Sequence, residues 1–184
     1  YIREEFSKSF PFPLILWVND QVFQQLLRLT PDLESWATSV EFQLTTNELF
    51  DFFRQKVKQL FSDDFVINKN DCLELEAACK ALQNQGQELE SEFKAGLEFC
   101  RGLDKFTNNQ IDLALEYYQK SLIFCQQSNQ LYKQGVLLLN IALSYYQKAE
   151  NNRALSQSLW QKSKEYFHRC LKLFVKTGHL ELVA

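Results

Sequence analysis

The chain has 184 residues and a formal net charge of −3, with a pI near 5.5, so broad attraction to nucleic acid or to an anionic membrane is not expected. Its hydrophobic fraction of 46%, with sixteen Phe, is enough to build an aromatic-rich core. No apolar run reaches the length of a membrane span, and the N-terminus lacks the pattern of a signal peptide.

The five cysteines are odd in number and widely spaced, and none forms a C-x-x-C pair. This usage is typical of buried thiols in a reducing cytoplasm, so we expect a cytoplasmic protein. A metal site is not expected, because only His168 and His179 could join the cysteines as ligands. The chain contains no Met and stops at Leu182-Val183-Ala184 without a closing element, which indicates a fragment of something longer.

The N-terminal third predicts strands around a helix. Residues 14–18 are five apolar residues in a row and indicate a strand buried on both faces. Asn19 can cap a helix over 20–29, and residues 40–44 alternate apolar and polar as in a half-exposed strand. This order predicts a right-handed βαβ unit, whose further partner strands come from missing sequence, another chain or the helices that follow.

A helical connector follows this α/β part. Thr45 and Glu48 have the spacing of a capping box at the start of a helix over about 46–61. The apolar stripe of that helix is formed by Leu49, Phe53, Val57 and Leu60. Asp71 is expected to cap the next helix, and residues 67–87 are predicted to form a connector between two domains.

From residue 88 onward a helical unit recurs. Residues 111–122 reappear forty-nine residues later as 160–171, with Ala114 matching Ser163 and Tyr118 matching Phe167. Small and aromatic residues at these spacings lie on one helix face, so the small ones let a neighbouring helix approach while the aromatic ring fills the gap beside it. Such a repeat predicts stacked helical hairpins.

A second correspondence, of residues 96–99 with 142–145 at an offset of forty-six, supplies the first helix of each unit. Glycine at 178 should stop the last helix. We therefore expect four helices, over roughly 88–107, 110–126, 130–151 and 157–176.

These units resemble the tetratricopeptide repeat, which has small and aromatic residues at five positions. The matches are Gly96, Phe99, Ala114, Tyr118 and Ser121 in the first unit, and Ala142, Tyr145, Ser163, Phe167 and Cys170 in the second. The two helices of each unit lie further apart in sequence than in the family, and no proline follows the second helix. The resemblance implies an α-solenoid over residues 88–184; HEAT-like or armadillo-like repeats, or an irregular bundle, stay open.

The N-terminal third carries a second resemblance. Residues 3–6, 13–18 and 29–36 are similar to one region of bacterial STAND-type signalling ATPases, which carry repeat arrays behind the ATPase domain. This similarity implies that residues 1–66 are the C-terminal part of such a domain. The chain has no G-x-x-x-x-G-K-[ST] loop to hold phosphates, so no nucleotide cofactor is expected in it.

The tetratricopeptide resemblance also implies a binding groove lined by the first helix of each unit. In that register the groove residues are Lys94, Arg101, Asn140 and Gln147. Lys94 and Arg101 would favour an acidic peptide or a C-terminal carboxylate. The alternative is that all four are ordinary polar residues on solvated faces.

Taken together, the sequence predicts a mainly α protein with helical hairpins after a small α/β remnant of one or two strands. We expect a protein–protein interaction module of a signalling protein, without catalysis, metal or cofactor. Two alternatives are part of a P-loop ATPase whose nucleotide site lies upstream, and a structural module that forms a homodimer through residues 14–18.

Overall fold

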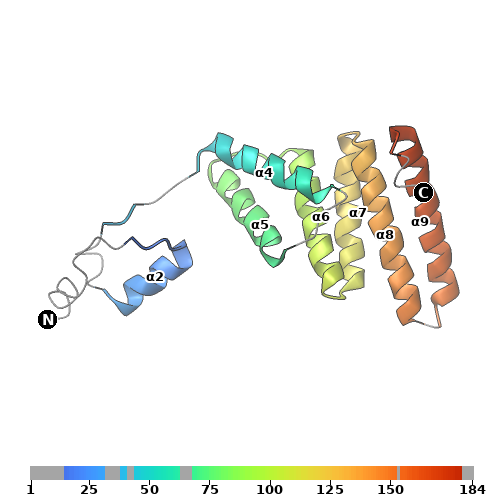
Figure 1. Ribbon diagram of the computed structural model, residues 1–184, viewed down its shortest axis with the longest axis horizontal. Helices are drawn as coiled ribbons and strands as arrows, with labels where there is room; N and C mark the ends of the chain where they lie inside the picture. The colour runs from blue at the N-terminus through green and yellow to red at the C-terminus, as the bar shows by residue number, and fades with distance from the viewer. Residues whose placement is uncertain (1–14, 32–37, 41–43, 63–67, 153, 180–184) are drawn as a thin grey trace. The chain divides into compact units, whose positions relative to one another are not determined.

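The computed structural model describes residues 15–31, 38–40, 44–62, 68–152 and 154–179 (Figure 1). The chain divides into two compact units, residues 1–43 and 44–184. The described parts of both are mainly helical and contain no strand.

The first unit has one described helix, α2 (Asp20–Leu29), at the bounds expected from the sequence. The Asn19 side chain caps it by accepting a hydrogen bond from the backbone N–H of Val22 at 2.9 Å. At the other end, the Thr30 hydroxyl donates to the carbonyl of Leu26 at 2.7 Å. The predicted helix and its cap are therefore confirmed.

The predicted strands are not observed. Residues 15–18 are exposed and do not form a strand. Of the predicted strand 40–44, only the two end residues are described, neither in a strand, and 41–43 lie outside the described residues. An apolar run becomes a strand only where another strand satisfies its backbone N–H and C=O groups, and the described residues provide none.

The second unit consists of six described helices: α4 (Thr46–Leu60), α5 (Lys69–Asn84), α6 (Ser91–Thr107), α7 (Ile111–Gln127), α8 (Leu131–Asn151) and α9 (Ser156–Thr177). Helices α6 and α7 pack side by side as one hairpin, and α8 and α9 as another, with α7 against α8 (Figure 1). The bounds expected from the helical period are confirmed to within three residues.

Local capping chemistry sets where these helices begin and end. At α4 the predicted capping box is present, because the Thr45 N–H donates to Glu48 Oε2 at 2.8 Å and the Glu48 N–H donates to Thr45 Oγ1 at 3.3 Å. At α5 the expectation that Asp71 is the cap is wrong. Asn68 caps the helix, and Asp71 closes the box by accepting from the Asn68 N–H at 2.7 Å.

The hairpin turns depend on asparagine. Asn109, between α6 and α7, and Asn129, between α7 and α8, have φ angles of 59° and 53°, in the left-handed region that Asn tolerates better than most residues. Gly178, with φ of 79°, ends α9 as expected. The two turns that contain Asn109 and Asn129 are short, so the helices on either side of each turn stay in contact.

Aromatic rings join α4 to α6. The Phe53 and Phe93 rings lie 5.0 Å apart, and the Phe61 and Phe99 rings stack at 4.5 Å. The predicted stripe of α4 is buried, as Leu49, Phe53, Val57 and Leu60. This stripe makes α4 part of the same hydrophobic core as the hairpins.

Small residues bring the helices of each hairpin close together. Gly102 of α6 lies directly under the ring of Tyr118 on α7, and Gly135 of α8 lies under the ring of Phe174 on α9. In the second hairpin, the buried Ser163 hydroxyl of α9 donates to the carbonyl of Ala142 on α8 at 2.8 Å. Gly102 and Gly135 are not among the small positions that the sequence repeat singled out, whereas Ser163 is one of them.

Candidate interaction surfaces

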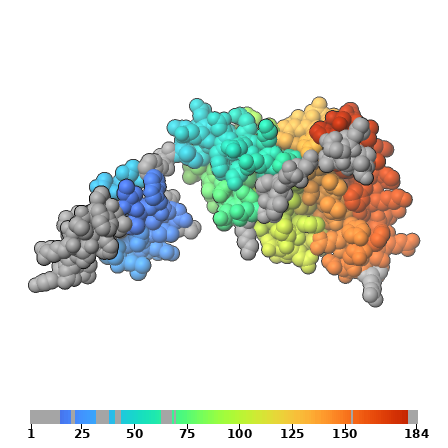
Figure 2. Space-filling view, in the orientation of Figure 1, coloured from blue at the N-terminus to red at the C-terminus, as the bar shows by residue number. Residues whose placement is uncertain are grey.

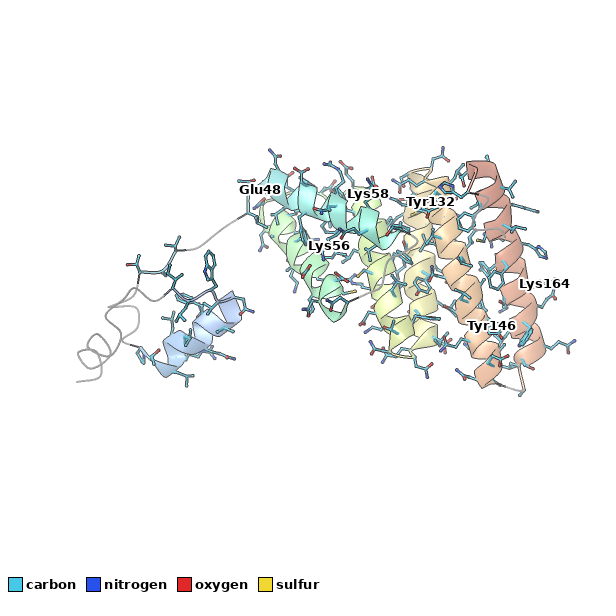
Figure 3. All side chains as sticks on the ribbon, in the orientation of Figure 1. Glu48, Lys56, Lys58, Tyr132, Tyr146 and Lys164 are labelled. Carbon is cyan, nitrogen blue, oxygen red and sulfur yellow. The ribbon has the colours of Figure 1, made fainter. Side chains whose placement is uncertain are left out.

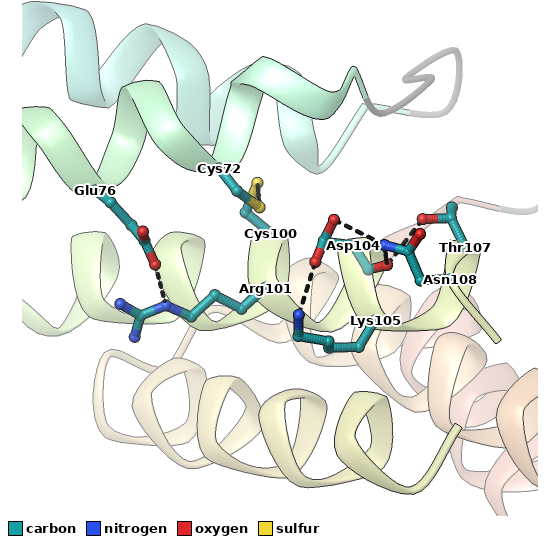
Figure 4. A network of polar contacts seen from close by, with 8 residues as sticks. All are labelled: Cys72, Glu76, Cys100, Arg101, Asp104, Lys105, Thr107 and Asn108. Carbon is teal, nitrogen blue, oxygen red and sulfur yellow. Dashed lines mark hydrogen bonds and ion pairs between the residues drawn. The ribbon is translucent and has the colours of Figure 1, made fainter. Parts of the chain in front are cut away.

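Two of the four predicted groove residues lie on α6. Lys94 is exposed, whereas Arg101 is half-buried between two carboxylates. Its Nε lies 2.9 Å from Glu76 Oε1 on α5 (Figure 4), and its Nη1 lies 2.8 Å from Glu98 Oε1. Burial opposes the charged guanidinium, but the two carboxylates outweigh burial and raise the pKa of Arg101. Its charge is thus already balanced within the protein.

The other two predicted groove residues lie on α8. The Asn140 amide donates to the carbonyl of Val136 on its own helix at 2.9 Å. The Gln147 amide donates to Asn109 Oδ1, in the turn between α6 and α7, at 3.2 Å. Within the described part of the chain, no hydrogen bond or ion pair joins this pair to the pair on α6, and the groove stays a prediction.

A different surface is evident on α9, where four large apolar side chains lie exposed on one helix face. Trp160 is 48% exposed, Phe167 37%, Leu171 41% and Val175 54%. Their spacings of seven, four and four residues place them along a single stripe, which we call the α9 stripe. Helix α9 thus has a buried face packed on α8 and a partly exposed apolar stripe, whose Trp160 ring lies 5.4 Å from the Tyr146 ring of α8.

The internal repeat shows what this second face corresponds to. Ile111, Tyr118 and Leu122 of α7 occupy the places of Trp160, Phe167 and Leu171, and their side chains are only 8%, 0% and 8% exposed. Helix α7 has a described helix on each side, α6 and α8, and the ring of Tyr118 packs on α6, against Gly102 and Phe99. Helix α9 is the last of the described helices and packs on α8 (Figures 1 and 2).

Polar contacts fix α8 on α7 at both ends of their interface. The Gln134 amide of α8 donates to the carbonyl of Cys125 at 3.0 Å, and Lys148 forms an ion pair with Asp112. Among the described residues, no helix covers α9 in the way that α8 covers α7. The exposed stripe could have been expected from the sequence, because the correspondence between residues 111–122 and 160–171 pairs buried residues of α7 with residues of α9.

The α9 stripe has basic surroundings. The helix carries five basic residues and one acidic residue; the basic ones are Lys162, Lys164, Arg169, Lys172 and Lys176. Lys164 lies within the stripe and points away from α8 (Figure 3). An open hollow of about 420 Å³ lies at the N-terminal end of the stripe and is lined by Ser156, Gln157, Trp160, Gln161 and Lys164. Lys164 therefore places a positive charge within the stripe, whereas Lys162 lies over the Tyr145 ring of α8.

Among the described residues, no group of three or more His, Cys, Asp or Glu side chains could hold a metal ion, and no described helix is long and apolar enough to cross a membrane. Four of the five cysteines are buried, as expected, and Cys72 is half-buried.

No family model, no curated protein and no solved structure matches the chain. The internal repeat and the chemistry of the surface are therefore the observations that bear on function.

Proposed function

We propose that the chain is a protein–protein interaction module of the tetratricopeptide-like kind, and that its partner presents an acidic amphipathic helix to the α9 stripe. The observation that supports this proposal is the contrast between α7 and α9. Matching apolar side chains are buried on α7, which has a described helix on each side, and are exposed on α9.

Helix α8 packs on α7, and a partner helix would pack on the exposed side of α9. The apolar face of that partner helix would cover Trp160, Phe167 and Leu171. Covering half-exposed side chains of this size contributes on the order of 1 kcal/mol each from this side of the interface. After the cost of association, we expect an affinity in the micromolar range or weaker.

Charge decides between an unrelated partner and a second copy. In a two-fold dimer formed through the same surface, α9 would meet α9, and Lys164 of each copy would lie in the same interface. Like charges across an interface are unfavourable, whereas an acidic helix would be attracted. The stripe therefore fits an acidic partner better than a second copy of the chain.

The resemblance of residues 3–36 to one region of STAND-type ATPases suggests the setting. In a bacterial signalling protein of that kind, the helical repeats would hold a partner in the cytoplasm while an upstream ATPase responds. The chain itself would then contribute recognition and no catalysis.

A second candidate function is dimerisation through the N-terminal unit. The apolar residues Ile15 and Leu16 are exposed there, next to the cap of α2. Pairing with a second copy would bury them. Light scattering distinguishes this candidate, since it expects a stable dimer that an Ile15→Asp, Leu16→Asp variant converts to a monomer.

The test of the main proposal is peptide binding measured by fluorescence anisotropy. The probe is a designed helical peptide with a leucine stripe flanked by glutamates, and its matched probe carries lysines in place of the glutamates. We expect binding of the acidic probe only, weakened by about tenfold or more in Leu171→Glu. The control is Ile123→Glu, on a 54% exposed site of α7 outside the stripe, which should bind as wild type.

Equal binding of both probes, or no effect of Leu171→Glu, would overturn the proposal. A dimer of the wild-type chain that Leu171→Glu dissolves would instead assign the stripe to a second copy.

A further inference from the structure

Two cysteines from different helices lie in direct contact. Cys72 is in the first turn of α5, Cys100 is in the middle of α6, and their Sγ atoms are 2.7 Å apart (Figure 4). A disulfide bond is about 2.05 Å long, so a movement of about 0.7 Å would bring the two atoms to bonding distance. Both are free thiols in this structure. Among the described residues, this is the only contact between two sulfur atoms.

The two thiols differ in how solvent reaches them. Cys72 is half-buried, whereas Cys100 is completely buried. The hydrogen bond from Cys72 and the burial both raise the pKa of the Cys100 thiol, which keeps it protonated. An oxidant in solution would therefore meet Cys72 first and leave Cys100 as the thiol held beside it.

We infer that Cys72 and Cys100 form a reversible disulfide that joins α5 to α6. With hydrogen peroxide as the oxidant, the Cys72 thiol is oxidised to a sulfenic acid and one water is released. The Cys100 sulfur then attacks Cys72 Sγ, the S–S bond forms and the S–O bond breaks. The hydroxyl group leaves with the Cys100 proton as a second water, and a dithiol reductant reverses the bond by exchange.

The bond would strengthen the part of the fold where α5 is held by polar contacts. Glu76, one turn after Cys72, pairs with Arg101, the residue next to Cys100. On its other side α5 is held to α4 by the ion pair of Asp71 with Lys56, at 2.8 Å. Such pairs weaken as salt rises, whereas a disulfide would not. Oxidation would thus fix the position of α5 on α6 independently of ionic conditions.

This inference does not depend on the proposed partner, because the thiol pair lies on α5 and α6 and the stripe lies on α9. The other cysteines provide a matched control. Cys79 is on α5, two turns beyond Cys72, and is buried. Its thiol makes no contact with another sulfur atom among the described residues.

The experiment is oxidation of the folded chain by hydrogen peroxide or by oxidised glutathione, followed by alkylation of free thiols, digestion and mass spectrometry. We expect one cross-linked peptide pair containing Cys72 and Cys100, which dithiothreitol removes. Cys79→Ser should keep this product and Cys72→Ser should abolish it, while circular dichroism shows that both variants are folded. The oxidised wild type should also melt several degrees above the reduced protein.

Three results would overturn the inference. The first is alkylation of both thiols after oxidation of folded protein. The second is a disulfide of Cys72 with another chain, and the third is a sulfinic acid at Cys72 without a link to Cys100.

Discussion

Val57 of α4 fills the space that a side chain at Gly96 of α6 would need. A Cβ atom on Gly96 would lie 2.3 Å from Val57 Cγ2, closer than real contacts of this kind. Because position 96 has no side chain, α4 can lie directly on α6 and bury its aromatic stripe there. The contact therefore decides whether α4 belongs to the helical core.

Replacing Gly96 with alanine should destabilise the protein by about 1–3 kcal/mol, because the clash with the branched Val57 outweighs a helix-propensity gain of about 1 kcal/mol. Chemical denaturation measures this change in the free energy of unfolding. Combining it with Val57→Ala should cost less than the sum of the two single changes. Lys94→Ala, on the exposed face of α6, is the control and should stay within about 0.5 kcal/mol of wild type. A fully stable Gly96→Ala protein would exclude this packing.

The corresponding leucines of α7 and α9 should differ in how much their replacement by alanine lowers the free energy of unfolding. Leu122→Ala on α7 should cost about 2–5 kcal/mol, since that side chain is buried in the core. Leu171→Ala, at the matching place on α9, should cost less than about 1 kcal/mol, because this side chain is 41% exposed. Thermal unfolding of both variants gives the comparison. Equal costs would mean that another part of the chain covers α9.

Asp71 should make stability depend on pH. Burial alone would raise the pKa of its carboxyl group, but the hydrogen bonds from Lys56 and from the Asn68 N–H outweigh burial and lower it. Because the pKa is lower in the folded protein than its unfolded value of about 3.9, the ionised carboxylate stabilises the fold at pH values above 3.9. This stabilisation is lost as the pH falls through the pKa of the folded state.

Asp71→Asn should therefore lose about 1–3 kcal/mol near neutral pH and approach the wild type in acid. Denaturation curves across this pH range test the prediction. Asp51→Asn removes an exposed pair with Arg54 at 3.0 Å and should change little at any pH. A deficit of Asp71→Asn that persisted unchanged into acid would contradict the ionic role.

The disulfide should raise the free energy of unfolding. Cys72 and Cys100 are separated by 28 residues, and closing a loop of that length stabilises a chain by roughly 3–4 kcal/mol if the native geometry is unstrained. Comparing denaturation of the oxidised and the reduced protein measures the difference. Equal stability in the two states would show that strain in the bond offsets the loss of entropy in the unfolded chain.

The sequence predicted most of the helices because helical period and capping are local properties. The Thr45–Glu48 box and the Asn19 cap need only neighbouring residues, and the repeat fixed the bounds of α6 to α9. The predicted strands are not seen among the described residues, because strand formation is not a local property. The apolar run at 15–18 forms a strand only beside a partner strand, and the local sequence does not show whether a partner exists.

The candidate site was harder to predict because it depends on which helix lies beside which. Position in the repeat suggested Arg101 as a groove residue, but α5 brings Glu76 against it, and no repeat pattern contains that contact. The meeting of Cys72 with Cys100 has the same cause. The α9 stripe, by contrast, could have been found by asking which buried positions of α7 have no cover in the next repeat.

The equivalence of α7 and α9 has a consequence for how such a chain evolves. A further hairpin added on α9 would convert Trp160 and Leu171 from exposed into interior residues, without any change in those residues. The proposed partner helix would bury the same side chains between two molecules instead of within one chain. Under that proposal, a chain with one more hairpin would present a different exposed face to its partner.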